Sequence, residues 1–272
     1  MLRAIPDDNL AYPVLVTIPQ GGTGSGFFLN TSHSEFLVTA KHVLFSPSTG
    51  ALIGTDCSLI SYPRDPTETT RNELHLDLAK LCADGNVKAH ADADVAVVKI
   101  GNVSGQGVAT LLAGVTVNSM APSGILGVAE ASTKSFAEVL VANEVFIFGY
   151  PTSLGLKAIP QLDYAKPLLR KGIVAGKNDD LKTIVLDCPV YWGNSGGPVL
   201  EVQRVNLTTT RFSVVGVVSQ FVPLVETWLN QTQGFENIDL SNSGYSVATP
   251  MDPVIELIGT FVPAPAIGGA AV

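Results

Sequence analysis

Apolar and polar positions alternate along this chain in short segments, and glycine, proline and asparagine separate one segment from the next. Residues 74–78, Leu-His-Leu-Asp-Leu, alternate strictly, which is the period of a strand with one buried face. Further runs of strand length occupy residues 14–18, 24–29, 35–44 and 95–100. Turn residues between the second and third of these runs predict a hairpin. Several short strands at this spacing predict an all-β fold, either a barrel or a sandwich.

The second half of the chain repeats this pattern after a stretch rich in glycine, alanine, serine and valine, residues 101–135. We interpret that stretch as a last strand of the first half followed by a connector. The strands predicted beyond it cover residues 137–150, 168–175, 183–190, 212–221 and 245–248. Residues 250–260 include four apolar side chains close together and are the best helix candidate in the chain.

Composition indicates a folded, weakly charged protein. Of the 272 residues, 46% are hydrophobic and 15% are charged, against about 25% charged in ordinary domains. A net charge of −8 without a lysine or arginine cluster argues against nucleic acid or an anionic membrane as a partner. No stretch approaches the ~18 apolar residues of a membrane span.

The N-terminal residues and the cysteines give information on the cellular compartment of the protein. Residues 1–12 contain aspartates and no apolar run, which does not fit a secretory signal peptide. Cys57, Cys82 and Cys188 leave at least one cysteine unpaired, and their spacing matches no zinc pattern. We therefore expect a cytoplasmic protein, or a secreted one if a leader has been removed. We expect neither a metal nor another cofactor.

Residues 193–198, Gly-Asn-Ser-Gly-Gly-Pro, place a serine among glycines after a predicted strand. Glycine lets the backbone turn sharply, so that the N–H groups of Gly193 and Ser195 can point into one space and hold an oxyanion. The same residues match the G-x-S-x-G elbow of α/β-hydrolases, which needs a histidine after the serine. Every histidine precedes Ser195, which excludes that fold. These histidines are His33, His42, His75 and His90.

A serine nucleophile needs a base within hydrogen-bond distance, and the base needs a carboxylate. His42 lies at the end of the second strand of the predicted hairpin, and a strand end would hold its side chain rigidly. Asp94 opens the strand that follows it and is our candidate acid, with Asp92 as a rival two residues earlier. We interpret the other histidines as turn or surface residues.

Six short segments of the chain together resemble a known protein family. These segments are Gly24-Ser25-Gly26-Phe27, Thr39-Ala40-Lys41-His42, Asp94-Val95-Ala96-Val97-Val98, Phe148-Gly149-Tyr150-Pro151, the glycine-rich stretch around Ser195, and Val215-Gly216-Val217-Val218-Ser219. With these segments the chain resembles a trypsin-like serine peptidase of the chymotrypsin fold, closer to the bacterial HtrA-like branch than to digestive enzymes. The resemblance covers residues 13–260.

The resemblance implies two six-stranded antiparallel β-barrels, a short C-terminal helix and an active site in the cleft between the barrels. The first barrel, residues 13–120, would carry His42 and Asp94. The second, residues 136–260, would carry Ser195 and the specificity pocket, and residues 261–272 would form a flexible tail. HtrA relatives carry a PDZ domain after the peptidase, and we expect none here.

Departures from the family pattern carry information. Digestive members have an aspartate before the serine that pairs with a new N-terminus, whereas this chain has Asn194, so we expect no activation by that ion pair. The position at the base of the primary pocket is Pro189 and not an acid, which argues against cleavage after arginine or lysine. By resemblance Ser219, Gln220 and Phe221 form the pocket wall, and they predict small or medium apolar P1 residues.

The sequence therefore predicts a serine endopeptidase that acts on proteins or peptides through a Ser-His-Asp triad and an acyl-enzyme. The alternative is a binding or scaffold protein with a peptidase fold and little turnover. An ester hydrolase would share the triad. A regulatory partner is compatible with the sequence but leaves no signal in it.

Overall fold

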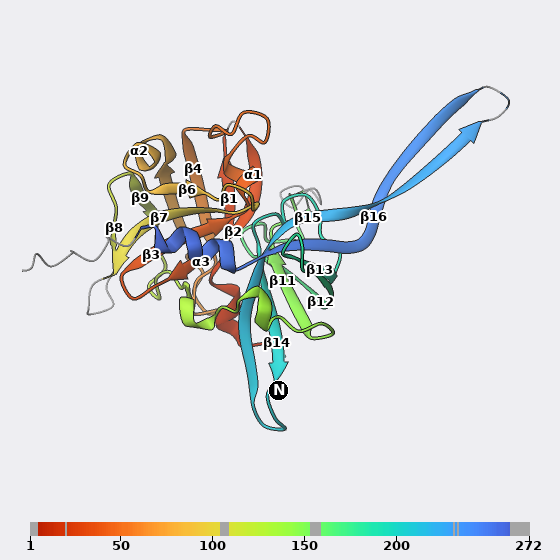
Figure 1. Ribbon diagram of the computed structural model, residues 1–272. Helices are drawn as coiled ribbons and strands as arrows, with labels where there is room; N and C mark the ends of the chain where they lie inside the picture. The colour runs from red at the N-terminus through yellow and green to blue at the C-terminus, as the bar shows by residue number, and fades with distance from the viewer. Residues whose placement is uncertain are drawn as a thin grey trace, which may run out of the picture.

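The computed structural model describes residues 5–19, 21–103, 109–152, 159–230, 232 and 234–261, and nearly all of its regular structure is β (Figure 1). The strands form two sheets that lie side by side, one from each half of the chain. The all-β, two-lobed architecture is thereby confirmed. No helix among the described residues is long and apolar enough to cross a membrane.

The N-terminal sheet has ten strands. They are β1 (Pro13–Ile18), β2 (Gly22–Asn30), β3 (Ser34–Thr39), β4 (Asp56–Ser61), β5 (Asn72–Asp77), β6 (Val87–Ala89), β7 (Ala96–Val103), β8 (Ala109–Leu111), β9 (Val115–Ser119) and β10 (Val128–Ala129). Their main order is β6-β7-β3-β2-β1-β4-β5-β9, with β8 on β7 and β10 on β2.

This sheet differs in detail from the six-stranded barrel that the resemblance implied. Its end strands β6 and β9 do not pair within the described residues, so the sheet curves without closing. Helix α2 (Leu78–Ala83) lies between β5 and β6 along the chain and contacts both of them. Its Leu78 and Leu81 are buried in the core of this lobe.

The C-terminal sheet is a closed six-stranded barrel, as expected. Its strands, in ring order, are β11 (Glu144–Gly149), β12 (Leu168–Asn178), β13 (Thr183–Asp187), β16 (Phe235–Pro250), β15 (Thr210–Asn230) and β14 (Pro198–Arg204). Short 3-10 turns flank the two sheets: η1 (Asp7–Leu10), η2 (Glu130–Ser132) and η3 (Phe136–Glu138).

One element that bears on the site was predicted wrongly. The expected strand over residues 35–44 ends at Thr39, where its partner strand β7 begins, and Lys41–Leu44 form a short helix, α1. Its turn is closed by hydrogen bonds from Val43 N–H to Ala40 and from Phe45 N–H to Lys41. His42 therefore lies on a helical turn and not at the end of a strand.

A hydrophobic core joins the two lobes. Tyr12, Phe27 and Val97 of the first lobe belong to the same buried cluster as Phe148 and Leu200 of the barrel. The predicted C-terminal helix is confirmed as α3 (Asp252–Gly259), whose buried residues Val254, Leu257 and Ile258 also belong to this cluster. The chain thus crosses back from the barrel to the first lobe, and the seam between the lobes is packed. The expected tail lies almost wholly outside the described residues.

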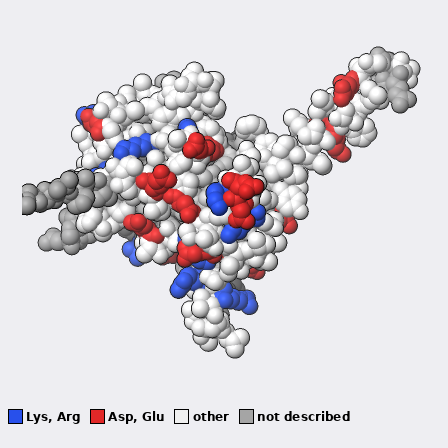
Figure 2. Space-filling view, in the orientation of Figure 1, with Lys and Arg blue, Asp and Glu red and all other residues white. Residues whose placement is uncertain are grey.

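Strands β15 and β16 are much longer than the runs 212–221 and 245–248 that the pattern predicted. Their outer parts, residues 223–230 and 235–242, form a two-stranded ribbon that projects from the barrel (Figure 1). The sequence did not predict strand there, because Pro223 and the many amide and hydroxyl side chains beyond it are not typical of a strand. Figure 2 shows acidic but no basic side chains along this ribbon, which we call the outer ribbon.

Candidate active site

His42 and Asp94 form a close pair at the seam of the two lobes. The imidazole Nδ1 of His42 lies 2.8 Å from one Asp94 carboxylate oxygen, and the backbone N–H of His42 donates to the other oxygen at 3.1 Å. Asp94 lies in the bend just before β7. Within the described residues the rival Asp92 makes no hydrogen bond to His42, and its N–H donates to His90. The structure therefore selects Asp94 as the acid next to this histidine.

Ser195 lies in the turn between β13 and β14 and shares a pocket of about 280 Å³ with His42 and Asp94. Its hydroxyl donates to the Ser219 carbonyl at 3.4 Å. No hydrogen bond among the described residues joins Ser195 to His42. A hydroxyl turns about a single bond, and catalytic hydrogen bonds often tighten only when substrate is bound. The three predicted residues are thus brought to one pocket, with the serine turned toward Ser219.

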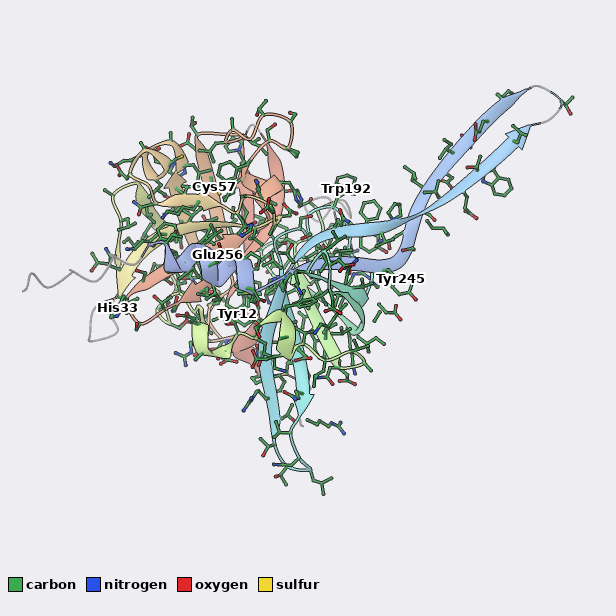
Figure 3. The ribbon with its side chains drawn as sticks, in the orientation of Figure 1. Tyr12, His33, Cys57, Trp192, Tyr245 and Glu256 are labelled. Atoms are coloured by element: carbon green, nitrogen blue, oxygen red, sulfur yellow. The ribbon has the colours of Figure 1, made fainter. Side chains whose placement is uncertain are left out.

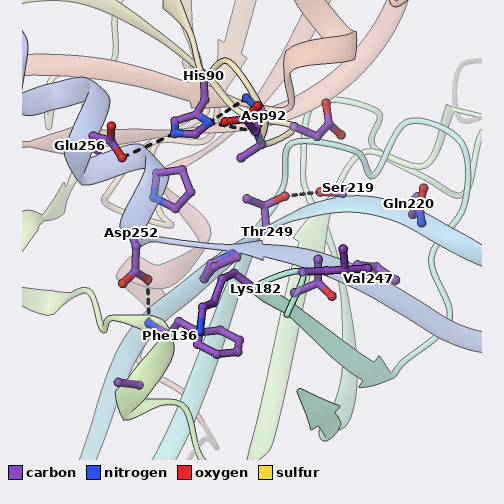
Figure 4. A pocket seen from close by; sticks show the side chains of 17 residues that line it. His90, Asp92, Phe136, Lys182, Ser219, Gln220, Val247, Thr249, Asp252 and Glu256 are labelled. Carbon is purple, nitrogen blue, oxygen red and sulfur yellow. Dashed lines mark hydrogen bonds and ion pairs between the residues drawn. The ribbon is translucent and has the colours of Figure 1, made fainter. Parts of the chain in front are cut away.

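The loop that carries Asp94 is organised around His90. Its Nδ1 accepts hydrogen bonds from the N–H groups of Asp92, at 3.2 Å, and Ala93, at 2.9 Å, and Figure 4 shows the ring between that loop and Glu256. Lys41 Nζ donates to the His90 carbonyl at 2.8 Å, which ties the residue before His42 to the same loop. Sequence reasoning missed this role of His90. The one sequence feature that could have indicated this role is the position of His90, four residues before Asp94.

The glycines around Ser195 are required by their backbone geometry. Gly193 has a φ of 98° in a turn that Asn194 N–H closes onto Tyr191 at 2.9 Å, and Gly196 has a φ of 89°. A side chain at Gly193 would collide with the Tyr150 carbonyl. Neither the N–H of Gly193 nor that of Ser195 donates a hydrogen bond within the described part of the chain. Two amides at the predicted oxyanion position are therefore available.

Ser25 of β2 holds this loop from the other lobe. Its side chain is fully buried, and its hydroxyl donates to the Gly193 carbonyl at 2.7 Å and accepts from Tyr150 N–H at 2.9 Å. Its own N–H donates to the Ser195 carbonyl at 2.8 Å. The sequence indicated the Gly-Ser-Gly-Phe segment only as part of the resemblance, because nothing local reveals what a buried hydroxyl will meet.

The walls of the small pocket agree in part with the predicted specificity residues. Ser219, Gln220 and Phe221 line it, whereas Pro189 does not, and its neighbour Val190 does. Trp192, which sequence reasoning missed, is 72% exposed and packs edge to face on Phe221 with ring centroids 5.8 Å apart. In Figure 3 Trp192 lies at the mouth of the barrel, close to the root of the outer ribbon. Asp94 is the only carboxylate among the lining residues of this pocket.

A larger groove of about 700 Å³ opens on the other side of Asp94 and Ser219 (Figure 4). Its acidic residues are Asp92, Asp94, Asp252 and Glu256, and its basic residues are His90 and Lys182. Phe136, Leu181, Val247 and Pro250 supply apolar wall. Within the chain as described, no group of three or more histidine, cysteine, aspartate or glutamate residues is arranged to hold a metal ion.

Other nucleophilic groups near the site are held in their protonated form. Burial raises the pKa of the Cys188 thiol to about 11, despite the opposing charge of Arg170. Burial also raises the pKa of the Tyr150 phenol, as does the negative charge of Asp163. Both groups are therefore protonated and neutral at physiological pH.

A family model described as the trypsin-like peptidase domain matches residues 24–207, which is more than half of the chain. The chain belongs to the trypsin-like peptidase family. It is accordingly a serine protease, and the prediction of a serine endopeptidase is confirmed at this level. A search of curated protein sequences found no match.

Solved structures show the same fold at low sequence identity. Deg5 is 17% identical with a TM-score of 0.51, and the match covers 92% of this chain and 88% of that one. The thermostable serine protease AL20 from an extremophilic microorganism is 12% identical with a TM-score of 0.51, over 94% and 98% of the two chains. HBP is 9% identical with a TM-score of 0.53, over 97% of each chain. These matches support the chymotrypsin-like double-barrel fold.

Proposed function

We propose that this protein cleaves peptide bonds within proteins, with Ser195 as nucleophile, His42 as general base and Asp94 as the carboxylate that orients His42. The observation that carries the proposal is the 2.8 Å contact between the His42 ring and Asp94 in the pocket that also contains Ser195. A buried hydroxyl from the first lobe supports the oxyanion loop of the second, which keeps the site in shape before substrate arrives.

The chemistry follows from these contacts. Asp94 accepts a hydrogen bond from the Nδ1–H group of His42, so Nε2 carries a free lone pair. The Ser195 hydroxyl turns from the Ser219 carbonyl to the imidazole, loses its proton to Nε2 and attacks the substrate carbonyl carbon. The N–H groups of Gly193 and Ser195 receive the oxyanion. His42 then gives its proton to the leaving amine, and water hydrolyses the acyl-enzyme by the same route.

The pocket supports small or medium apolar P1 residues. Trp192 and Phe221 line it with aromatic rings that pack on each other, and its only carboxylate, Asp94, already pairs with His42, which leaves none to meet a lysine or arginine side chain. A cation buried there would remain unpaired, which is unfavourable. Cleavage-site profiling on a peptide library tests this preference, and a dominant P1 lysine or arginine would contradict it.

A fluorophosphonate probe tests the catalytic roles. We expect labelling of the wild type and none of Ser195→Ala. Asp94→Asn is expected to lower peptide hydrolysis by about 10⁴-fold, because the imidazole loses the partner that sets its tautomer. Asp92→Asn is the matched control, and it should retain activity close to that of the wild type. Equal losses in the two asparagine variants would contradict the assignment of Asp94.

A second candidate function is a binding or scaffold protein with little turnover. It is favoured by the Ser195 hydroxyl, which bonds to Ser219 and not to His42. A folded wild-type protein that resists the probe at every pH would support this candidate. Comparison of peptide and ester substrates separates an endopeptidase from an esterase with the same residues.

We further propose a cytoplasmic location. The support is chemical, since Cys57, Cys82 and Cys188 are all free thiols in the structure. Fractionation of the source cells with an antibody against this protein tests the proposal. Recovery from the medium or from an oxidising compartment would contradict it.

A further inference from the structure

The small pocket at the candidate active site is continuous with the larger groove. The two cavities share Asp94, Ser219 and Gln220 in their walls. His42 lines the small pocket and a further cavity of about 280 Å³, but it does not line the groove. Because His42 protonates the leaving amine, the substrate chain after the scissile bond lies on the side of His42. The chain before that bond is therefore directed toward the groove.

An edge of β15 leads from the small pocket to the groove. Among the described residues β14 pairs with β15 only as far as Val217, whereas β16 also pairs with Gln220 and Phe221. The free edge lies next to Ser195, whose hydroxyl reaches the Ser219 carbonyl. An extended peptide can add to such an edge as one more strand. At about 3.3 Å per residue, three residues span roughly 10 Å, so the second to fourth residues before the scissile bond can reach the groove.

The groove combines an apolar wall with an accessible carboxylate. Phe136, Val247 and Pro250 contribute to the wall. Glu256 of α3 lines the groove with its side chain 72% exposed and its carboxylate 3.5 Å from His90 Nε2. Lysine and arginine side chains have a long apolar stem and a cation at the tip, and they bury the stem while the charge stays in water. A side chain of this kind matches the groove.

The charge in the groove is negative overall. Figure 4 shows Glu256 and His90 at one end of the groove and Phe136 and Lys182 at the other. Lys182 Nζ lies 5.2 Å from the centre of the Phe136 ring. It is the only lysine among the lining residues, which include four carboxylates: Asp92, Asp94, Asp252 and Glu256. A cleft lined mainly by one sign of charge attracts ligands of the opposite sign.

We propose that Glu256 selects substrates with a lysine or arginine two to four residues before the scissile bond. The Glu256 carboxylate pairs with the cation, and the apolar stem lies along the wall of the groove. Glu256 is the more available carboxylate of α3, because Asp252 accepts the Phe136 N–H at 2.7 Å. This proposal rests on the proposed function, since it names the substrate class of the same site. The small pocket still takes an apolar P1 residue.

A set of peptides that share one small apolar P1 residue tests the proposal. Lysine, glutamine or glutamate occupies each of the second, third and fourth positions before the scissile bond in turn. At one of these positions we expect kcat/KM to be about two- to fivefold higher with lysine than with glutamine, which is the range of an exposed ion pair. The glutamate peptide should be cleaved more slowly still. The advantage of lysine should shrink as salt rises.

Variants of the groove test the role of Glu256 itself. Glu256→Gln should remove the advantage of lysine, and Glu256→Lys should reverse it in favour of the glutamate peptide. Lys182→Gln should enlarge the advantage, because it removes the opposing cation. Glu226→Gln, at an exposed position on the outer ribbon, is the matched control and should keep the wild-type ratio. The ratio of two peptides cancels any general loss of activity in a variant.

A binding measurement separates this proposal from the proposed function. Ser195→Ala cannot cleave peptides, so fluorescence anisotropy gives its dissociation constants for the lysine and glutamine peptides without turnover. We expect the lysine peptide to bind about two- to fivefold more tightly. Equal affinities would overturn the proposal, as would a Glu256→Gln variant that keeps the advantage of lysine. A wild type that neither reacts with fluorophosphonate nor cleaves any peptide would refute the proposed function, and the affinities would still decide the role of Glu256.

Discussion

At the scale of single residues, the site depends on side chains that never touch the substrate. Ser25 makes three hydrogen bonds to the barrel, two of them to the loop that carries the oxyanion amides. A group held this way fixes the loop geometry before the reaction. Electrostatic stabilisation of the transition state is strong because the donors are already in place. Ser25 is therefore a positioning residue.

Ser25→Ala should lower kcat about 10- to 100-fold with little change in KM, because loss of loop geometry affects the transition state more than substrate binding. The control is Ser46→Ala, which removes an exposed hydroxyl from the same lobe. Steady-state kinetics on one peptide measure both variants. A rise in KM at constant kcat would show that Ser25 acts on binding instead.

Glu35 makes stability depend on pH. Burial raises its pKa to about 7 from an ordinary value of 4.5. The folded state therefore holds a proton that the unfolded state has lost between those two values, so stability is greatest below pH 4.5 and falls as pH rises toward 7. The loss is about 3 kcal/mol at most.

Glu35→Gln should abolish this loss and raise stability at pH 8 relative to the wild type. Urea unfolding at pH 5 and pH 8 measures the difference. Glu130→Gln, at an exposed position, is the control for the change in net charge. An identical pH profile for wild type and Glu35→Gln would contradict the assignment.

At the scale of elements, the bend before β7 is held by His90 and not by regular structure. His90→Ala should lower the rate of fluorophosphonate labelling about 10- to 100-fold. The Asp92 and Ala93 amides would lose their hydrogen-bond acceptor, and Asp94 would no longer be held beside His42. His75→Ala is the control, since His75 pairs at 3.1 Å with the half-exposed Asp56 and lies outside the loop that carries Asp94. Normal labelling of His90→Ala would remove this residue from the positioning group.

The connector between the lobes is anchored by a buried ion pair. Glu201 of β14 is fully buried, Lys134 is 7% exposed, and the second Glu201 carboxylate oxygen accepts from Leu140 N–H at 3.2 Å and Asn143 at 2.9 Å. Removal of one partner leaves a buried charge without compensation.

Lys134→Ala should destabilise the protein by about 3–5 kcal/mol. Lys171→Ala breaks the exposed pair with Glu144 and should change stability by less than about 1 kcal/mol. Chemical denaturation with the same probe compares the two variants. Partial recovery in the double variant Lys134→Met/Glu201→Leu would support the buried-charge explanation, and equal effects of the two lysines would refute it.

At the scale of the whole molecule, the two lobes share one buried cluster. Tyr12 of the first lobe and Phe148 of the barrel lie with ring centroids 5.8 Å apart, and helix α3 packs into the same core. The active site spans this seam, so catalysis requires both lobes to stay together. We expect the lobes to unfold as one unit.

Phe148→Ala should therefore lower the stability by about 3–5 kcal/mol in a single transition, because a cavity in the shared core destabilises both lobes at once. Leu207→Ala, at a fully exposed leucine, should have little effect. Differential scanning calorimetry measures both. Two separate transitions in the wild type would show that the lobes are independent.

Local chemistry in the sequence determined the all-β class, the C-terminal helix and the glycine-rich loop at Ser195. Alternation, turn residues and backbone freedom act over a few neighbouring residues, so a single chain displays them. Six short segments in order along the chain also indicated the peptidase family, which the family comparison shows.

Tertiary structure decided the rest. Asp92 and Asp94 are chemically identical and two residues apart, and only packing selects which of them meets His42. The bonds of Ser25, the open first sheet and the exposed outer ribbon likewise depend on segments far apart in the chain. Such contacts arise when distant surfaces meet, and no local pattern encodes the distance between them.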